Sequence, residues 1–306
     1  MRCLVLLSLL VAANSSAATP QKLHDYARTE LRELSSSRAL PNGVEVNSGK
    51  AIIQITALRD DVIRVRIGRE GTLPEDASWA VLPSARQARA NVTPDNTKAA
   101  VGFRTKNLRV QIERATLRLL VTDLQGNILQ EDAAGWPAEF HDKAFRIYKK
   151  MPFDEHYFGL GDKVGPLDRR NQAFSMWNTD AYNFQESTDP IYKSIPFFLT
   201  MRAGRTLGVL LDNTWRTSFD FGKQTDGVYS FGADGGPVDY YLLYGPAPKE
   251  VLQTYAWLTG PPPPAAAVVP GLSTVTVQLW DGSGAARNRG KIALRANSIR
   301  RALSGY

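Results

Sequence analysis

Residues 157–198 read YFGLGDKVGPLDRRNQAFSMWNTDAYNFQESTDPIYKSIPFF, a stretch rich in carboxylates, amides, arginines and aromatic side chains. Glycine and proline interrupt it, and it shows neither a helical period nor a long alternation of apolar and polar residues. Long loops of this kind on a β scaffold commonly carry binding groups, because the scaffold holds them in place. We therefore take this stretch as the candidate functional site and the flanking segments as its support.

On both sides of this stretch, apolar and polar residues alternate with the two-residue period of β-strands. Clear examples are residues 43–55 and 62–67, joined by a hairpin connection at 59–61. Arg64 and Arg66 alternate with the apolar residues of the second example, and we expect them to face solvent. Strand patterns about ten residues apart, with no helices between them, predict an all-β antiparallel sandwich.

One segment departs from this pattern. Residues 249–258, KEVLQTYAWL, have apolar side chains at helical spacing, and Gly260 follows as a stop signal. The sequence therefore predicts one short helix at the end of the sandwich, with its apolar face formed by Val251, Leu252, Tyr255 and Leu258.

The two ends of the chain differ in composition from residues 40–260, the predicted sandwich domain. Residues 1–18 combine a basic residue, an apolar run and small residues, which is typical of a secretory signal peptide. The run is shorter than the roughly 20 residues that span a bilayer. We expect export to the periplasm or the cell exterior, without membrane association after signal removal. Residues 19–39 form a lead-in, and 261–306 a Pro- and Ala-rich linker with an irregular tail.

Charge and residue counts exclude several classes of function. The net charge is +7, but residues 261–306 hold six basic residues and one acid, a net of +5. The other 31 basic and 29 acidic residues leave +2, so nothing favours nucleic-acid binding by the folded part. The single cysteine, Cys3, excludes a disulfide framework. Scattered histidines and the absence of a phosphate loop or dinucleotide motif predict no metal and no cofactor.

Several distinctive sequence blocks follow one another along the chain. They are YFGLGDK at 157–163, GPLDRR at 165–170, MWNTDAY at 176–182, DPIYKSIPFF at 189–198, GVLLDNT at 208–214 and YAWLTGPP at 255–262. Together these blocks resemble the N-terminal domain of family 31 glycoside hydrolases, the α-glucosidase and α-xylosidase type enzymes. The resemblance covers residues 40–262 and implies a β-supersandwich of galactose-mutarotase-like fold. In that family the sandwich precedes a catalytic (β/α)₈ barrel.

The resemblance also implies which residues contact a sugar. The Asn178-Thr179-Asp180 block matches the family segment whose aspartate reaches the sugar in the −1 subsite, so Asp180 and Asn178 are expected to bind substrate. A carboxylate suits this role because it makes short, strong hydrogen bonds with O–H donors. Trp177 and Tyr182 flank Asp180, and their rings could stack on the sugar or fix the loop to the scaffold. The expected partner is an α-glucoside or α-xyloside type carbohydrate.

The sequence departs from the family after residue 262. Where the family continues into its barrel, this chain reads PPAAAVVP at 263–270, with an acid-poor tail that resembles translation of a shifted reading frame. Residues 261–306 are too few for a barrel of about 250 residues. The family's catalytic carboxylates are therefore missing, no catalytic residue is assigned, and we expect the isolated chain to be inactive.

Three hypotheses about function stay open at this point. The chain is the sugar-contacting part of an α-glycoside hydrolase, a stand-alone secreted sugar-binding module, or one subunit of a split enzyme whose barrel is a separate chain. The third predicts an exposed apolar surface near Trp257 and the tail. A mutarotase would need a His and Glu pair, for which His156 is the only plausible histidine.

The remaining polar and aromatic residues of interest are expected to be structural. Asp168, Arg169 and Arg170 predict a local ion-pair turn. Trp215 and Trp257 are expected in the core or at a domain interface. The other acids of the central stretch, which we expect to cap turns or to face solvent, are Asp162, Glu186 and Asp189.

Overall fold

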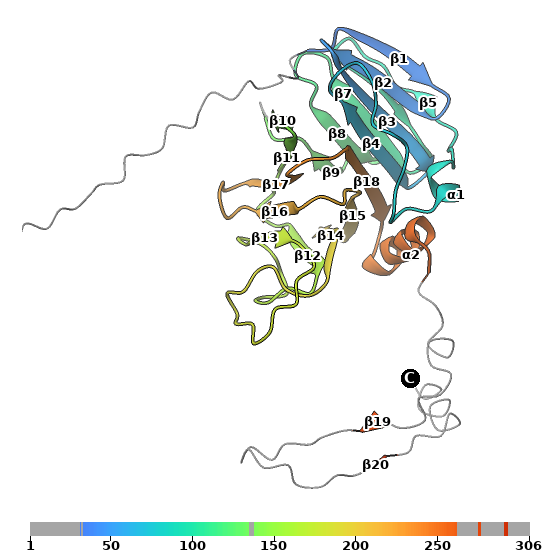
Figure 1. Cartoon of the computed structure of the whole chain (residues 1–306). Helices are drawn as coiled ribbons and strands as arrows, with labels where there is room; N and C mark the ends of the chain where they lie inside the picture. Colours follow the sequence, from blue (N-terminus) through green and yellow to red (C-terminus); the bar gives the residue numbers. More distant parts are fainter. Residues whose placement is uncertain (1–30, 32, 135–137, 262–274, 277–290, 293–306) are drawn as a thin grey trace, which may run out of the picture.

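The computed structural model describes residues 31, 33–134, 138–261, 275–276 and 291–292. The predicted signal peptide, most of the predicted lead-in and most of the tail lie outside these residues. The described residues form antiparallel β-sheets, as the alternation of the sequence predicts, and two helices, of which the sequence predicts only the second (Figure 1). Among them, no helix is both long and apolar enough to cross a bilayer.

The largest sheet contains eight strands in the order β1-β2-β3-β4-β18-β15-β14-β12. β1 begins at Ser36, inside the predicted lead-in, and the segment 43–55 is a hairpin rather than one strand because Gly49, with φ +57°, turns the chain. The strands are β1 (Ser36–Leu40), β2 (Gly43–Ser48), β3 (Ala51–Arg59), β4 (Val62–Gly68), β12 (His156–Gly161), β14 (Ser194–Arg202), β15 (Arg205–Leu211) and β18 (Val238–Gly245).

Two five-stranded sheets complete the sandwich. One follows the chain order and contains β5 (Thr93–Pro94), β6 (Ala100–Arg104), β7 (Leu108–Glu113), β8 (Leu119–Asp123) and β9 (Ile128–Glu131). The other has the order β10-β11-β17-β16-β13, with β10 (Ala138–His141), β11 (Ala144–Lys150), β13 (Ala173–Met176), β16 (Thr217–Phe221) and β17 (Val228–Ala233). In the tail, β19 (Val275–Thr276) pairs with β20 (Lys291–Ile292).

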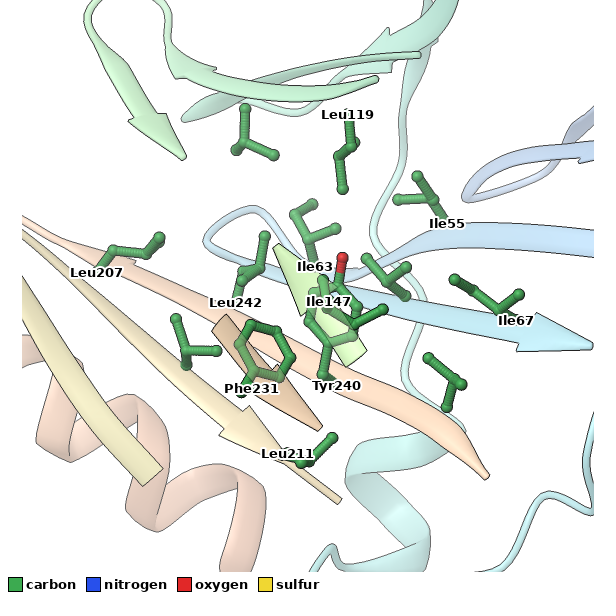
Figure 2. Packing of buried hydrophobic residues seen from close by; sticks show 14 of the residues in the cluster. Ile55, Ile63, Ile67, Leu119, Ile147, Leu207, Leu211, Phe231, Tyr240 and Leu242 are labelled. Carbon is green, nitrogen blue, oxygen red and sulfur yellow. The ribbon is translucent and has the colours of Figure 1, made fainter. Parts of the chain in front are cut away.

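One face of the large sheet packs against both smaller sheets. Figure 2 shows side chains from all three sheets meeting in this core. Because successive strand residues point to opposite faces, every second residue of β15 and β18 enters it. Each fully buried apolar side chain of this kind stabilises the fold by about 1.5–3 kcal/mol. Buried members labelled in the figure are Ile55, Ile63, Ile67, Leu119, Ile147, Leu207, Leu211, Phe231, Tyr240 and Leu242.

The other face of the large sheet is covered by α1 (Pro83–Arg86) and α2 (Pro248–Thr259). α2 confirms the predicted helix, and it ends at Gly260, whose N–H donates to the Ala256 carbonyl at 2.9 Å. Leu252, however, is half-exposed, whereas Val251, Thr254 and Leu258 are buried and Tyr255 stacks on Phe197 of the sheet.

α2 approaches the sheet directly over Gly208 of β15. A Cβ at this position would lie 2.7 Å from Val251 Cγ1, so only glycine allows the helix to pack this closely.

Arg64 and Arg66 also lie on this second face, and the prediction that they face solvent was wrong. Both are buried, at 3% and 7% exposed. The guanidinium of Arg64 donates to Asp239 and to Asp76, and that of Arg66 donates to the Pro74 carbonyl. The 69–82 segment therefore covers this end of the sheet. Alternation shows which face a side chain points to, but not what covers that face.

Candidate functional site

The central stretch is not a single irregular loop, because it contains β12, β13 and the start of β14. β12 escaped the sequence prediction because it is irregular. Leu160 and both glycines, Gly159 and Gly161, have positive φ angles, and the pairing with β14 shifts register between the two glycines. The long connection that remains, residues 177–193, is called the 177–193 loop below, and in Figure 1 it projects beyond the strands in the yellow-green region.

A buried lysine fixes the base of the 177–193 loop. The ammonium group of Lys163, whose side chain is 1% exposed, donates to the Ser175 carbonyl and to the Asp189 carboxylate, both at 2.6 Å. The second oxygen of Asp189 accepts from the Ser175 N–H at 2.5 Å. Charge-assisted hydrogen bonds of this kind are roughly twice as strong as neutral ones, so the loop starts and ends at a defined position.

Further contacts hold the loop along its length. The Thr179 N–H donates to the Tyr192 carbonyl at 3.2 Å, and the Tyr192 hydroxyl donates to the Ala181 carbonyl at 3.1 Å. The Asn178 side-chain oxygen accepts from the Ser194 N–H at 2.8 Å. Asp180 therefore stands on a loop that its own residues keep in shape.

The four predicted sugar-contacting residues share this loop but divide into two pairs. Asp180 is exposed, and its carboxylate accepts no hydrogen bond from the described residues. Tyr182 is also exposed, at 94%. Trp177 and Asn178 instead line a groove with a volume of about 500 Å³. Asp180 and Tyr182 do not line it.

This groove brings together residues that the sequence did not group. Its lining includes Trp79 from the 69–82 segment, Trp177 at the start of the 177–193 loop, Ser194 directly after that loop, and Asp212 and Trp215 after β15. Trp79 is 95% exposed and Trp215 is 48% exposed, so Trp215 does not lie in the core, while its expected place at a domain interface stays a prediction. We call this hollow the tryptophan groove.

Trp215 rests on the backbone of two glycines. A Cβ on Gly235 would lie 2.8 Å from the indole ring, and one on Gly236 would lie 2.5 Å from it. The Asn213 amide donates to the carbonyls of Gly235 and Pro237, both at 2.9 Å, and its oxygen accepts from the Trp215 N–H at 2.7 Å. One side of the ring is thereby fixed while half of the residue stays open to solvent.

Asp212 is an acid that lines the groove, and its surroundings shift its pKa. It is 8% exposed, its Oδ1 accepts from the Ser78 hydroxyl at 2.8 Å, and its Oδ2 has no hydrogen-bond partner among the described residues. Burial raises the pKa of Asp212 to about 6, with a further contribution from the nearby Asp239 carboxylate. The bond from Ser78 and the charge of Arg64 act in the opposite direction.

Asp212→Asn is expected to stabilise the fold at neutral pH by about 1–2 kcal/mol. The folded-state pKa lies above the ordinary 3.8, so the folded state favours the protonated carboxyl. Folding stability therefore falls as pH rises from about 4 to about 6, and it stays at this lower value at higher pH. Urea unfolding at pH 7.5 and pH 3.5 measures the effect. The gain should be present at the higher pH and absent at the lower, and equal gains at both would contradict it.

Other acids of the central stretch have structural partners. Asp168 accepts from the backbone N–H groups of Tyr157 and Arg170 and lies 2.7 Å from the ring of His156. Burial raises the pKa of Asp168, but these bonds outweigh it and hold the pKa below its usual range. The predicted ion-pair turn is thus wrong in its partner, because Asp168 pairs with His156 while buried Arg169 donates to backbone carbonyls.

Among the described residues, no group of three or more His, Cys, Asp or Glu side chains is placed to hold a metal ion. Trp257 is partly buried and lies under the guanidinium of Arg59, 4.9 Å from the ring centre. Apart from Phe153, the exposed aromatic residues of the described part lie instead in the tryptophan groove or on the 177–193 loop.

Comparison with known proteins places the chain in a family. Residues 52–220 match the family of the glycosyl hydrolase 31 N-terminal galactose mutarotase-like domain. Alpha-glucosidase 2 of Bacillus thermoamyloliquefaciens is 35% identical over 216 residues, which is 70% of this chain and 27% of that protein. Alpha-xylosidase XylQ of Lactiplantibacillus pentosus is 25% identical over 229 residues, which is 73% of this chain and 29% of that protein.

A solved structure agrees with these matches. The GH31 dextranase of Flavobacterium johnsoniae, in complex with isomaltotriose, aligns with a TM-score of 0.70 and 31% identity over 75% of this chain and 28% of that chain. The chain thus spans little more than a quarter of the length of these relatives. The sandwich, the family match and the sequence identity agree, and the chain belongs to glycoside hydrolase family 31, where it corresponds to the N-terminal galactose mutarotase-like domain.

Proposed function

We propose that this chain forms the sugar-contacting N-terminal wall of an α-glycoside hydrolase active site, with Asp180 as its principal contact. The observation that carries the proposal is the exposed Asp180 carboxylate, which accepts no bond from the described residues and stands on a loop braced by Lys163 and Asp189. The similarity to an α-glucosidase and to a dextranase solved with isomaltotriose supports an α-glucoside as the ligand.

We also propose that this chain alone does not hydrolyse glycosides. Glycosidases need two carboxyl groups about 5–5.5 Å or about 6.5–9.5 Å apart. Three other acids of the central stretch already accept hydrogen bonds from neighbouring residues, so their role is to hold the loop and they are poor candidates for a catalytic pair. They are Asp162, Asp168 and Asp189. The hydrolytic carboxylates would come from the part of the relatives that this chain does not span.

A chimera tests the role of Asp180. Residues 31–261 replace the matching region of alpha-glucosidase 2 from Bacillus thermoamyloliquefaciens, and turnover of p-nitrophenyl α-glucoside is measured. Asp180→Ala should lower kcat/KM by about 10- to 100-fold, the effect of losing a charged hydrogen-bond acceptor. Glu186→Ala, which removes an exposed carboxylate from the same loop, is the matched control and should leave kcat/KM unchanged.

The outcome separates the hypotheses. If the chimera is active and Asp180→Ala has the same kcat/KM as the unsubstituted chimera, Asp180 does not contact the substrate. Turnover by the purified chain of residues 1–306 on its own would overturn the proposal that it is inactive alone.

The tryptophan groove favours a second candidate function, a stand-alone secreted sugar-binding module. Three tryptophans line one hollow of about 500 Å³, a size within the roughly 300–1,000 Å³ of small-molecule sites. A split enzyme stays a third proposal, and its exposed surface would be this groove rather than Trp257. We also propose export to the periplasm or the cell exterior, because residues 1–18 have the pattern of a signal peptide.

A further inference from the structure

We propose that the tryptophan groove itself binds a sugar ring, with Trp215 as the stacking platform and the side chains of Asp212 and Ser194 as its hydrogen-bonding partners. The ligand class, a carbohydrate, rests on the proposed function. The contacts lie elsewhere, because Asp212, Ser194 and Trp215 are distinct from Asp180 at the exposed part of the 177–193 loop.

The platform is preformed. Gly235 and Gly236 support one side of the Trp215 ring, and Asn213 ties this glycine turn to the Trp215 backbone. The ring therefore needs little ordering when a ligand arrives, which reduces the entropic cost of binding. The apolar C–H face of a sugar ring matches an indole face of this kind.

Two residues that line the groove carry a buried polar atom without a partner in the described part of the chain, which favours a hydroxylated ligand. Asp212 Oδ2 and Ser194 Oγ are buried and have no hydrogen-bond partner among the described residues, and both residues line the groove. A buried polar atom without a partner costs about 1–3 kcal/mol, so it marks a place where a partner is expected. One atom is an acceptor, and the other can both donate and accept. Two neighbouring hydroxyl groups of a sugar can donate a hydrogen bond to the first atom and exchange one with the second.

The same lining argues against an apolar protein segment as the occupant. Such a segment would close the groove over the Asp212 carboxylate and leave Oδ2 without a donor. Burying an unpaired charged group is more costly than burying a neutral one. A sugar covers the indole rings and still offers O–H donors, so it satisfies both parts of the lining.

Calorimetric titration of the full chain with isomaltotriose tests the proposal. The wild type should bind, and Trp215→Ala and Asp212→Asn should each weaken binding by about tenfold or more. Phe153→Ala, which removes an exposed aromatic residue outside the groove, is the matched control and should bind like the wild type.

With Asp212→Asn, a loss of binding cannot be explained by a loss of folding. This variant is expected to be more stable than the wild type at neutral pH, so weaker binding by a more stable protein would identify a ligand contact. Absence of binding by the wild type, or equal binding by Asp212→Asn and the wild type, would overturn the proposal. Self-association that Trp215→Ala abolishes and isomaltotriose leaves unchanged would also overturn it, because it indicates a protein occupant. None of these results affects Asp180, whose role the turnover of the chimera decides.

Discussion

Replacing Arg64 by methionine is expected to destabilise the fold by about 3–5 kcal/mol, because the buried Asp239 carboxylate loses its closest cation and keeps only Arg66, at 3.6 Å. The guanidinium donates to Asp239 through two nitrogens, at 3.0 Å and 2.6 Å, and both side chains are only 4% exposed. It also binds Asp76 at 2.8 Å, which fastens the 69–82 segment to β4. Methionine keeps most of the apolar volume, so the loss reports on charge rather than on a cavity.

The measurement is urea unfolding at pH 7, with Arg38→Met as the control. Arg38 pairs with Glu45 at 2.7 Å, but its side chain is 68% exposed, and a pair of this kind contributes about 0–1 kcal/mol. The double variant Arg64→Met, Asp239→Asn removes both charges and should recover part of the loss. Equal effects at positions 64 and 38 would show that burial does not strengthen the Arg64 pair.

Arg64 also shows what the alternation of apolar and polar residues can and cannot predict. The period of two correctly predicts β4 and places Arg64 opposite Ile63 and Val65, which enter the core. It does not predict that residue 239 of β18 and residue 76 of the following 69–82 segment neutralise the guanidinium. A face that looks polar in sequence is solvent-exposed only when no later segment packs over it, and that depends on tertiary contacts.

The candidate site likewise has a part that the sequence predicts and a part that only the fold shows. The WNTD block at 177–180 is continuous in sequence, so its resemblance to family 31 leads directly to Trp177 and Asp180. The tryptophan groove combines positions 79, 177 and 215, which no sequence spacing connects. One local signal was available, since Gly235-Gly236 allows a ring to approach the backbone closely, but only the fold shows that the ring is that of Trp215.

Lys149→Met is expected to destabilise the fold by about 3–5 kcal/mol, again because it leaves a buried charge without its partner. The Lys149 side chain is 1% exposed, and its ammonium donates to Asp132 and, at 3.1 Å, to the Tyr240 hydroxyl. Burial lowers the pKa of Lys149, but the Asp132 carboxylate outweighs this effect and keeps the lysine charged at neutral pH. Lys149 lies on β11 of a five-stranded sheet, and Tyr240 lies on β18 of the eight-stranded sheet. The hydrogen bond between them therefore links the two sheets.

A double-mutant cycle separates this pairing from simple packing. Asp132→Asn alone leaves a buried ammonium, whereas the double variant Lys149→Met, Asp132→Asn leaves no charge. The amide oxygen of the introduced asparagine can still accept from the Leu119 N–H, as Asp132 Oδ2 does at 2.8 Å. The double variant should therefore be more stable than the sum of the single losses predicts, by about 1–3 kcal/mol, when urea unfolding is measured at pH 7. Additive losses would mean that Lys149 stabilises the core through its aliphatic chain, because only an interaction between the two charges makes the second substitution less harmful once the first is present.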